Sequence, residues 1–315
     1  MTNIDGKTLF LVFPFFRRNI IRKLQYPLLF AALIFSSCAS RSEGITVKEN
    51  QSEEIKAAPV KTDIDLEYDP NRLVFLLIGQ SNMEGAATPD SEEDVAINER
   101  VFVLAYTDDK GRKREYNKWY YAKPPLHAPW KVAVGPGDYF GKIMASSLPD
   151  EYSIALVPCA ISGVDIDFFR KDIVSKRRNE FSIPPDNKRE GAYEMVLERA
   201  LLASKAGKIS GILFHQGESD SGQMVWLDKV KEMVNDLRTD LDIPDLPFLA
   251  GELYYKGACS GHNSIIRKLP ERIDNSYVIS ADGLTGIDSY HFDIESQREL
   301  GRRYAEKMLE IINIE

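Results

Sequence analysis

Residues 73–85 read LVFLLIGQSNMEG, and this stretch is the most informative in the chain. Six apolar residues run without interruption into Gly79, which is typical of a strand buried on both faces of a parallel sheet. Ser81 lies just beyond, where the chain would leave the strand and enter a helix. Open α/β sheets place their chemistry at this carboxyl edge, and N–H groups at a helix start can stabilise a developing anion there. Ser81 is therefore a candidate nucleophile, and a small residue in a strand-to-helix turn is the structural alternative.

Two polar motifs far downstream favour the catalytic interpretation of Ser81. The sequence FHQGESD occupies residues 214–220, again at the end of an apolar run, and DSYHFD occupies residues 288–293 near the C-terminus. A serine nucleophile needs a base that takes its proton, and the base needs a carboxylate that fixes its tautomer. Asp288 and His291, three residues apart on one expected loop, can supply both groups.

The motifs GQSNM, HQGESD and DxxH occur in this order, and with them the chain resembles the SGNH hydrolases. The resemblance is to the branch that holds carbohydrate esterase family 6 and the sialate O-acetylesterase-like proteins, and it extends from residue 73 to the C-terminus. It implies a three-layer α/β/α sandwich with a mostly parallel, flavodoxin-like sheet of about five strands. It also implies a serine esterase that removes O-acetyl groups from an acetylxylan-type or sialate-type carbohydrate through an acyl-enzyme, without a cofactor.

Apolar runs alternate with helical patterns along the rest of the chain. This alternation predicts βαβ units, and therefore a parallel sheet with helices on both faces. The last expected helix has one apolar face and should lie across the sheet. The expected strands are residues 73–78, 101–105, 154–158, 209–214, 248–252 and 277–280. The expected helices are residues 137–147, 192–206, 224–239, 264–272 and 296–312.

The resemblance assigns catalytic roles to single residues. Ser81 is the expected nucleophile, His291 the base and Asp288 the acid that orients the base. Met83 stands where α/β-hydrolases have the second glycine of G-x-S-x-G, which favours the SGNH order with the serine first and the acid and histidine last. The rivals are the other histidines and the acids nearest to the expected base, namely His127, His215, His262, Asp282 and Asp293.

Three N–H donors are expected around the oxyanion, and the loss of one such donor costs roughly 10²- to 10³-fold in rate. They are the backbone N–H groups of Ser81 and Gly163 and the side chain of Gln216. In the family a glycine pair usually follows the third strand, and here Ser162 replaces the first glycine. Gln216 could instead cap the next helix. Glu218 is expected to support the loop, and an exchange of its role with that of the triad acid stays open.

Two long segments, residues 107–136 and 170–193, interrupt the alternation of strands and helices. Both follow expected strands, so they leave from the catalytic edge and are expected to wall the substrate cleft. The first segment holds Trp119 and Trp130, whose aromatic faces would stack on a sugar ring. Aromatic residues that cover the core beneath a loop are the structural alternative.

The first 70 residues are expected to lie outside the catalytic domain. Residues 1–37 carry a basic cluster and then an apolar stretch that is too short to span a membrane, which needs about 20 residues. Together with Cys38 they resemble the signal peptide of a bacterial lipoprotein, in which this cysteine carries the lipid. Residues 38–70 are expected to form a flexible tether, and residues 71–315 the esterase domain. The chain is therefore expected to be exported and membrane-anchored, facing the periplasm or the cell surface.

The net charge is −8, and the first 37 residues carry five basic and one acidic residue, so the remainder carries −12. Such an acidic domain argues against nucleic acid as a partner and against direct binding to anionic membranes, which leaves the lipid at Cys38 as the expected membrane contact. Cys159 and Cys259 permit a disulfide but do not require one. No Cys/His spacing suits zinc, so no metal is expected. An acetylated carbohydrate is the expected substrate; the alternatives are a general short-chain carboxylesterase or thioesterase, or a catalytically silent carbohydrate-binding protein.

Overall fold

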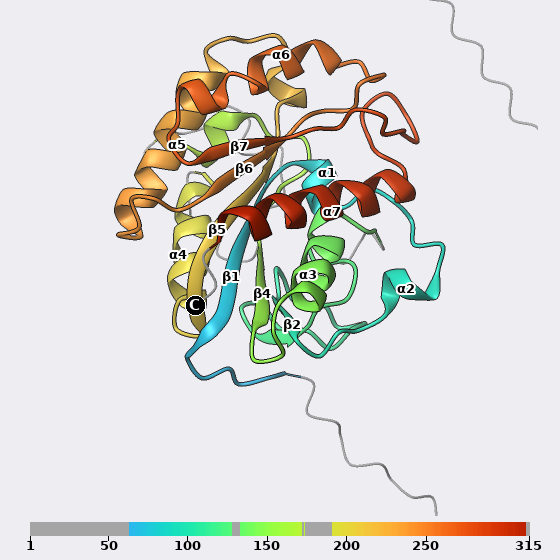
Figure 1. Cartoon of the computed structure of the whole chain (residues 1–315), viewed down its shortest axis with the longest axis vertical. Helices are drawn as coiled ribbons and strands as arrows, with labels where there is room; N and C mark the ends of the chain where they lie inside the picture. The colour runs from blue at the N-terminus through green and yellow to red at the C-terminus, as the bar shows by residue number, and fades with distance from the viewer. Residues whose placement is uncertain (1–62, 128–132, 172, 174–190, 313–315) are drawn as a thin grey trace, which may run out of the picture. The chain divides into compact units, whose positions relative to one another are not determined.

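The computed structural model describes residues 63–127, 133–171, 173 and 191–312 (Figure 1). The expected leader, Cys38 and Trp130 lie outside these residues. The described residues form a seven-stranded sheet with the order β3-β2-β4-β1-β5-β6-β7. Every pair of neighbours is parallel except β2 and β3, which are antiparallel. The strands are β1 (Asp69–Gly79), β2 (Val101–Leu104), β3 (Trp119–Tyr121), β4 (Ser153–Pro158), β5 (Gly207–His215), β6 (Phe248–Gly251) and β7 (Ser276–Ile279).

Helices cover both faces of the sheet, as Figure 1 shows. The helices α3 and α7 pack on one face, and α4 and α5 pack on the other. The long helices are α3 (Pro136–Ser147), α4 (Tyr193–Ala203), α5 (Trp226–Asp240) and α7 (Ile294–Ile311). The short helices are α1 (Ser81–Glu84), α2 (Glu92–Val95) and α6 (Asn263–Ile266).

The central strand β1 explains why the apolar run in the sequence has no polar interruptions. Its odd-numbered residues from Leu73 to Leu77 join the core beneath α3 and α7, and its even-numbered residues from Val74 to Ile78 join the core beneath α4 and α5. Successive side chains of a strand point to opposite faces. A strand that is covered on both sides must therefore be apolar at every position.

The last helix, α7, lies across the sheet as its apolar face predicts. Leu300, Tyr304 and Met308 are fully buried, and the Tyr304 hydroxyl donates to the carbonyl oxygen of Phe214 in β5 at 2.6 Å. Gly301 lets α7 approach α3 closely, because a Cβ there would lie 2.5 Å from the backbone carbonyl oxygen of the first residue of α3. This helix follows the loop that carries Asp288 and His291, so its docking sets where that loop begins and ends.

The predicted fold class is confirmed, but the predicted number of strands is wrong. The resemblance implied about five strands and the sequence pattern marked six; the described residues form seven, and the one that the pattern did not mark is β3, a three-residue antiparallel edge strand. The expected helix over residues 264–272 is also wrong, since α6 ends at Ile266 and a separate 3-10 turn covers Leu269–Glu271. Pro270 has no N–H that could continue the helix.

Three further features belong to the described part of the chain. Within it, the thiols of Cys159 and Cys259 are buried and free. The same residues contain no group of three His, Cys, Asp or Glu side chains that could hold a metal ion. None of the helices described is both long and apolar enough to cross a membrane.

Candidate active site

The turn after β1 places Ser81 at the carboxyl edge of the sheet, as the first residue of α1. Gly79 has a φ of +148°, and a Cβ there would lie 2.1 Å from the carbonyl oxygen of His215 in β5, so the turn requires glycine. The same carbonyl accepts the N–H of Gln80 at 2.9 Å. The neighbouring strand therefore holds the turn, and Ser81 is only 7% exposed.

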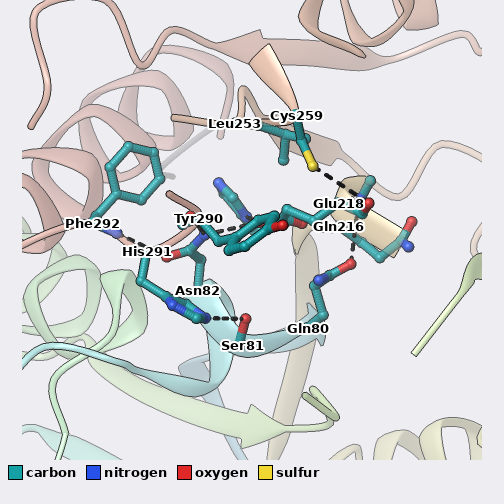
Figure 2. A network of polar contacts seen from close by, with 12 residues as sticks. Gln80, Ser81, Asn82, Gln216, Glu218, Leu253, Cys259, Tyr290, His291 and Phe292 are labelled. Atoms are coloured by element: carbon teal, nitrogen blue, oxygen red, sulfur yellow. Dashed lines mark hydrogen bonds and ion pairs between the residues drawn. The ribbon is translucent and has the colours of Figure 1, made fainter. Parts of the chain in front are cut away.

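Ser81, His291 and Asp288 form one chain of hydrogen bonds. The Oγ of Ser81 lies 2.9 Å from Nε2 of His291 (Figure 2), and Nδ1 of His291 lies 2.8 Å from Oδ2 of Asp288. The other oxygen of Asp288 accepts the backbone N–H groups of Tyr290 and His291, at 2.7 and 2.8 Å. The loop between β7 and α7 therefore fixes the acid relative to the histidine, and the fold brings both to the serine.

Hydrogen bonding keeps the Asp288 carboxylate charged. Burial raises its pKa, but hydrogen bonds from the His291 ring and from the N–H groups of Tyr290 and His291 together outweigh burial and lower the pKa to about 2. A charged carboxylate favours the imidazole tautomer with its hydrogen on Nδ1, which leaves the lone pair of Nε2 facing Ser81. A general base requires this arrangement.

The rival histidines and Asp293 have other partners. His215 Nε2 lies 3.0 Å from a backbone carbonyl, His262 Nδ1 accepts a backbone N–H at 3.2 Å, and His127 is buried in contact with an aromatic ring. Burial lowers the pKa of all three imidazoles to about 3 or 4, so they are neutral at physiological pH. Asp293 caps α7 by accepting the N–H of Ser296. His291 is therefore the histidine that is placed to act as the base.

Glu218 supports the site from the loop that follows β5. Its Oε1 accepts a hydrogen bond from Nδ2 of Asn82 at 2.8 Å, and burial raises its pKa to about 7. Asp288, and not Glu218, is hydrogen-bonded to His291, so the geometry favours Asp288 as the acid that orients the base. Asn82 was not among the predicted residues, and its only signal in the sequence is its place directly after the nucleophile.

The loop after β4 lies beside α1. Ile161 donates its N–H to the carbonyl of the last residue of β1 at 3.0 Å, and the Ser162 hydroxyl donates to the carboxylate of Glu84 in α1. Gly163 has a φ of +76°, and its carbonyl accepts the hydroxyl of Ser219 at 2.9 Å. These contacts bring the loop to the nucleophile turn, and the role of Gly163 as an oxyanion donor stays a prediction.

A sequence model of the family described as carbohydrate esterase, sialic acid-specific acetylesterase, matches residues 71–310. The chain belongs to this family. Three similar solved structures agree with the fold. A protein from Arabidopsis thaliana is 25% identical with a TM-score of 0.61, over 78% of this chain and 100% of that chain. NanS is 18% identical with a TM-score of 0.62, over 78% of this chain and 98% of that chain. A carbohydrate acetylesterase from Xanthomonas citri is 18% identical with a TM-score of 0.53, over 74% of this chain and 55% of that chain.

The structure contradicts one predicted oxyanion donor of this carbohydrate esterase, the side chain of Gln216. Its Nε2 donates to Asp220 at 2.6 Å and to the carbonyl of Val164 at 3.3 Å, and its Oε1 accepts the indole N–H of Trp226 at 2.6 Å. The side chain is fully buried. Both amide hydrogens are in use, so this side chain holds the loop after β5 to α5 instead of facing the substrate.

The structure also contradicts a predicted aromatic contact between this carbohydrate esterase and a sugar. Trp119 lies in β3, is only 8% exposed and joins the core, so it has no free face for a sugar ring. Its prediction as a substrate contact is wrong, because the segment that carries it forms an edge strand. Tyr290, which precedes His291, is 48% exposed. Its signal in the sequence is its place inside the DxxH motif.

Proposed function

We propose that this carbohydrate esterase removes O-acetyl groups by way of an acyl-enzyme on Ser81. One observation carries the proposal, the continuous chain of hydrogen bonds from Ser81 Oγ through His291 to Asp288. A hydroxyl that is hydrogen-bonded to a neutral imidazole nitrogen can pass its proton to that nitrogen as its oxygen attacks a carbonyl carbon.

The proposed reaction has two halves that use the same histidine. In the first, Ser81 Oγ attacks the acetyl carbonyl carbon and His291 Nε2 takes the serine proton, while Asp288 balances the imidazolium charge. The bond from the carbonyl carbon to the sugar oxygen then breaks, and His291 returns the proton to that oxygen. In the second half, a water activated by His291 attacks the acetyl-enzyme and releases acetate. The N–H groups of Ser81 and Gly163 are the proposed donors to the oxyanion.

The proposed first substrate is an O-acetylated sialic acid, because the family description names that specificity. Acetylated xylan is the second substrate to test. The segments that meet at the site are GQSNMEG, CAISGVD and HQGESDSGQ. They are small and mostly polar, and they offer little apolar surface for a long acyl chain, which supports acetyl as the group removed.

The test measures acetate release from an O-acetylated sialic acid, acetylated xylan and an aryl acetate. We expect the wild-type protein to hydrolyse the aryl acetate and at least one of the carbohydrates. Ser81→Ala should be inactive and should keep the wild-type unfolding temperature. Full activity of Ser81→Ala would exclude the acyl-enzyme. Hydrolysis of the aryl acetate alone would favour a general short-chain carboxylesterase, and activity on none of the three would favour a silent carbohydrate-binding protein.

We also propose that Cys38 carries a lipid and that the esterase domain faces the periplasm or the cell surface. The basic and then apolar pattern of residues 1–37 supports this proposal. One acyl chain binds a membrane only marginally, whereas two or more anchor a protein stably. The full-length protein should therefore fractionate with membranes of a bacterial host, and Cys38→Ala should release it or leave it unprocessed. Equal partitioning of both forms would contradict lipidation.

A further inference from the structure

Asn82 contacts the backbone on both sides of the catalytic histidine. Its Nδ2 donates to the carbonyl oxygen of Tyr290 at 3.0 Å, and its Oδ1 accepts the N–H of Phe292 at 3.2 Å (Figure 2). Tyr290 and Phe292 are the immediate neighbours of His291. Asn82 itself follows the nucleophile directly and is fully buried. One side chain on the rigid turn after β1 therefore holds both peptide groups that flank the base.

The surroundings of Asn82 permit only one orientation of its amide. Nδ2 faces two oxygen atoms, the carbonyl of Tyr290 and Oε1 of Glu218. Oδ1 faces two N–H donors, the backbone of Phe292 and, at 3.4 Å, the side chain of Gln297 in α7. A reversed amide would place oxygen against oxygen and N–H against N–H. A buried polar group without partners costs about 1 to 3 kcal/mol, so the reversed state is disfavoured.

Glu218 supplies the acceptor on the far side of Asn82. Its carboxyl is buried, and the loop that carries it is tied to the nucleophile turn, because Oε1 of Gln80 accepts the N–H groups of Gly217 and Ser219 at 3.4 and 3.5 Å. Three segments that are far apart in the sequence thus meet at one amide. Burial of this network makes each hydrogen bond matter more, because water cannot replace a lost partner.

We propose that Asn82 and Glu218 are positioning residues: Glu218 holds Asn82 in the orientation that pins the backbone around His291, and this fixes Nε2 of His291 against Ser81. The inference rests on the proposed function, since it assumes that these two atoms exchange a proton. A displacement of about 1 Å at a reacting group can cost about 100-fold in rate. The loss of either positioning residue should therefore lower kcat and leave KM for an aryl acetate nearly unchanged.

The first test compares two replacements of Glu218. Glu218→Gln keeps an acceptor oxygen of nearly the same shape and should retain activity within about fivefold, whereas Glu218→Ala removes the acceptor and should lower kcat by about 10- to 100-fold. Glu271→Ala, at an exposed glutamate outside the site, is the matched control and should behave as wild type. Equal losses in Glu218→Gln and Glu218→Ala, or no loss in either, would overturn the proposal.

The second test replaces Asn82 and remains decisive if Glu218→Ala does not fold. Asn82→Asp keeps the oxygen that faces Phe292 but puts a second oxygen against Tyr290 and Glu218, so kcat should fall by at least about 100-fold while KM stays within about threefold. The rate of inactivation by an active-site-directed phosphonate, which reports the reactivity of Ser81, should fall in parallel. Wild-type phosphonate reactivity in a folded Asn82→Asp would overturn the proposal. Activity of Ser81→Ala would instead overturn the proposed function, so the two failures can be told apart.

Discussion

Replacing Asp288 by asparagine should switch the proton of His291 to the wrong nitrogen. In the structure one oxygen of Asp288 accepts two backbone N–H groups, at 2.7 and 2.8 Å, and the other faces Nδ1 of His291 at 2.8 Å. In Asp288→Asn the amide oxygen must stay with the backbone donors, which turns the NH₂ group toward Nδ1. Nδ1 then acts as an acceptor and the hydrogen moves to Nε2, where it blocks acceptance of the serine proton.

The size of this effect follows from the loss of the base. The same change in another serine triad lowers kcat by about 10⁴-fold, and we expect a loss of that order here. A factor of 10⁴ corresponds to about 5 kcal/mol of transition-state stabilisation. The stability of the fold should change little, because the Asp288 side chain is 48% exposed and its backbone hydrogen bonds survive the substitution.

The assay is the steady-state hydrolysis of an aryl acetate by the wild-type protein and two variants. Asp288→Asn should be nearly inactive at every pH from 6 to 9. Both tautomers of the His291 ring carry the same number of protons, so a change of pH cannot convert the wrong one into the right one. Asp282→Asn, at an exposed acid outside the hydrogen-bond chain, should match the wild type. More than about a tenth of wild-type activity in Asp288→Asn would refute the tautomer argument. A greater loss in Glu218→Gln would reassign the triad acid.

Three further predictions concern acyl length, sugar binding and pH. Each methylene of the acyl chain that the site cannot accommodate should cost about 1 to 3 kcal/mol of transition-state stabilisation. Acetyl esters should therefore exceed butyryl esters by at least about tenfold in kcat/KM. A kcat/KM that stays constant from acetyl to octanoyl esters would favour a general esterase. Tyr290→Ala should raise KM for an acetylated sugar by about 2- to 10-fold, because a stacked ring contributes about 0.5 to 1.5 kcal/mol. Tyr68→Ala, at an exposed tyrosine directly before β1, is the control. The same KM in Tyr290→Ala and the wild type would exclude stacking. Burial raises the pKa of Asp138 to about 7, so the native state keeps a proton that the unfolded state releases, and the contribution of Asp138 to stability should decline as pH rises from about 4 to 7. Asp138→Asn should flatten this decline in thermal unfolding, and an unchanged slope would contradict the assignment.

The sequence predicted the sheet because its strands are buried and therefore apolar throughout. Such strands appear in the sequence as continuous apolar runs. The edge strand β3 was missed because it has one neighbour in the sheet and only three residues, which are too few to show a strand period. The break after α6 was missed because the apolar pattern continues through Pro270, although the backbone hydrogen bonds cannot.

The hydrogen-bonded serine, histidine and aspartate were predictable for a different reason. Ser81, Asp288 and His291 each lie in a short motif whose residue types are dictated by one reaction. Gln216 also lies in a motif, but the partner that decides its orientation, Trp226, comes from the following helix and carries no such mark. Asn82 was missed for the same reason, since its partners lie more than 100 residues away along the chain. Short motifs therefore identify the reacting groups. Tertiary packing decides how the neighbouring amide side chains, Asn82 and Gln216, are oriented.

Different contacts hold the turn that carries Ser81 and the loop that carries His291. This difference predicts how substitutions near each of them affect stability and activity. Ser81 lies on a turn held by strands β1 and β5, where Gly79 lies against the backbone of His215 at the end of the apolar strand β1. His291 lies on a loop with two exposed residues, Ile287 and Tyr290. The polar contacts of Asn82 and the buried ring of Phe292 hold this loop. Core substitutions in β1 should therefore lower stability before they lower the activity of the folded fraction. Substitutions in the polar network should lower the activity of the folded fraction as well as stability, because they release the backbone around His291 and leave buried polar groups without partners.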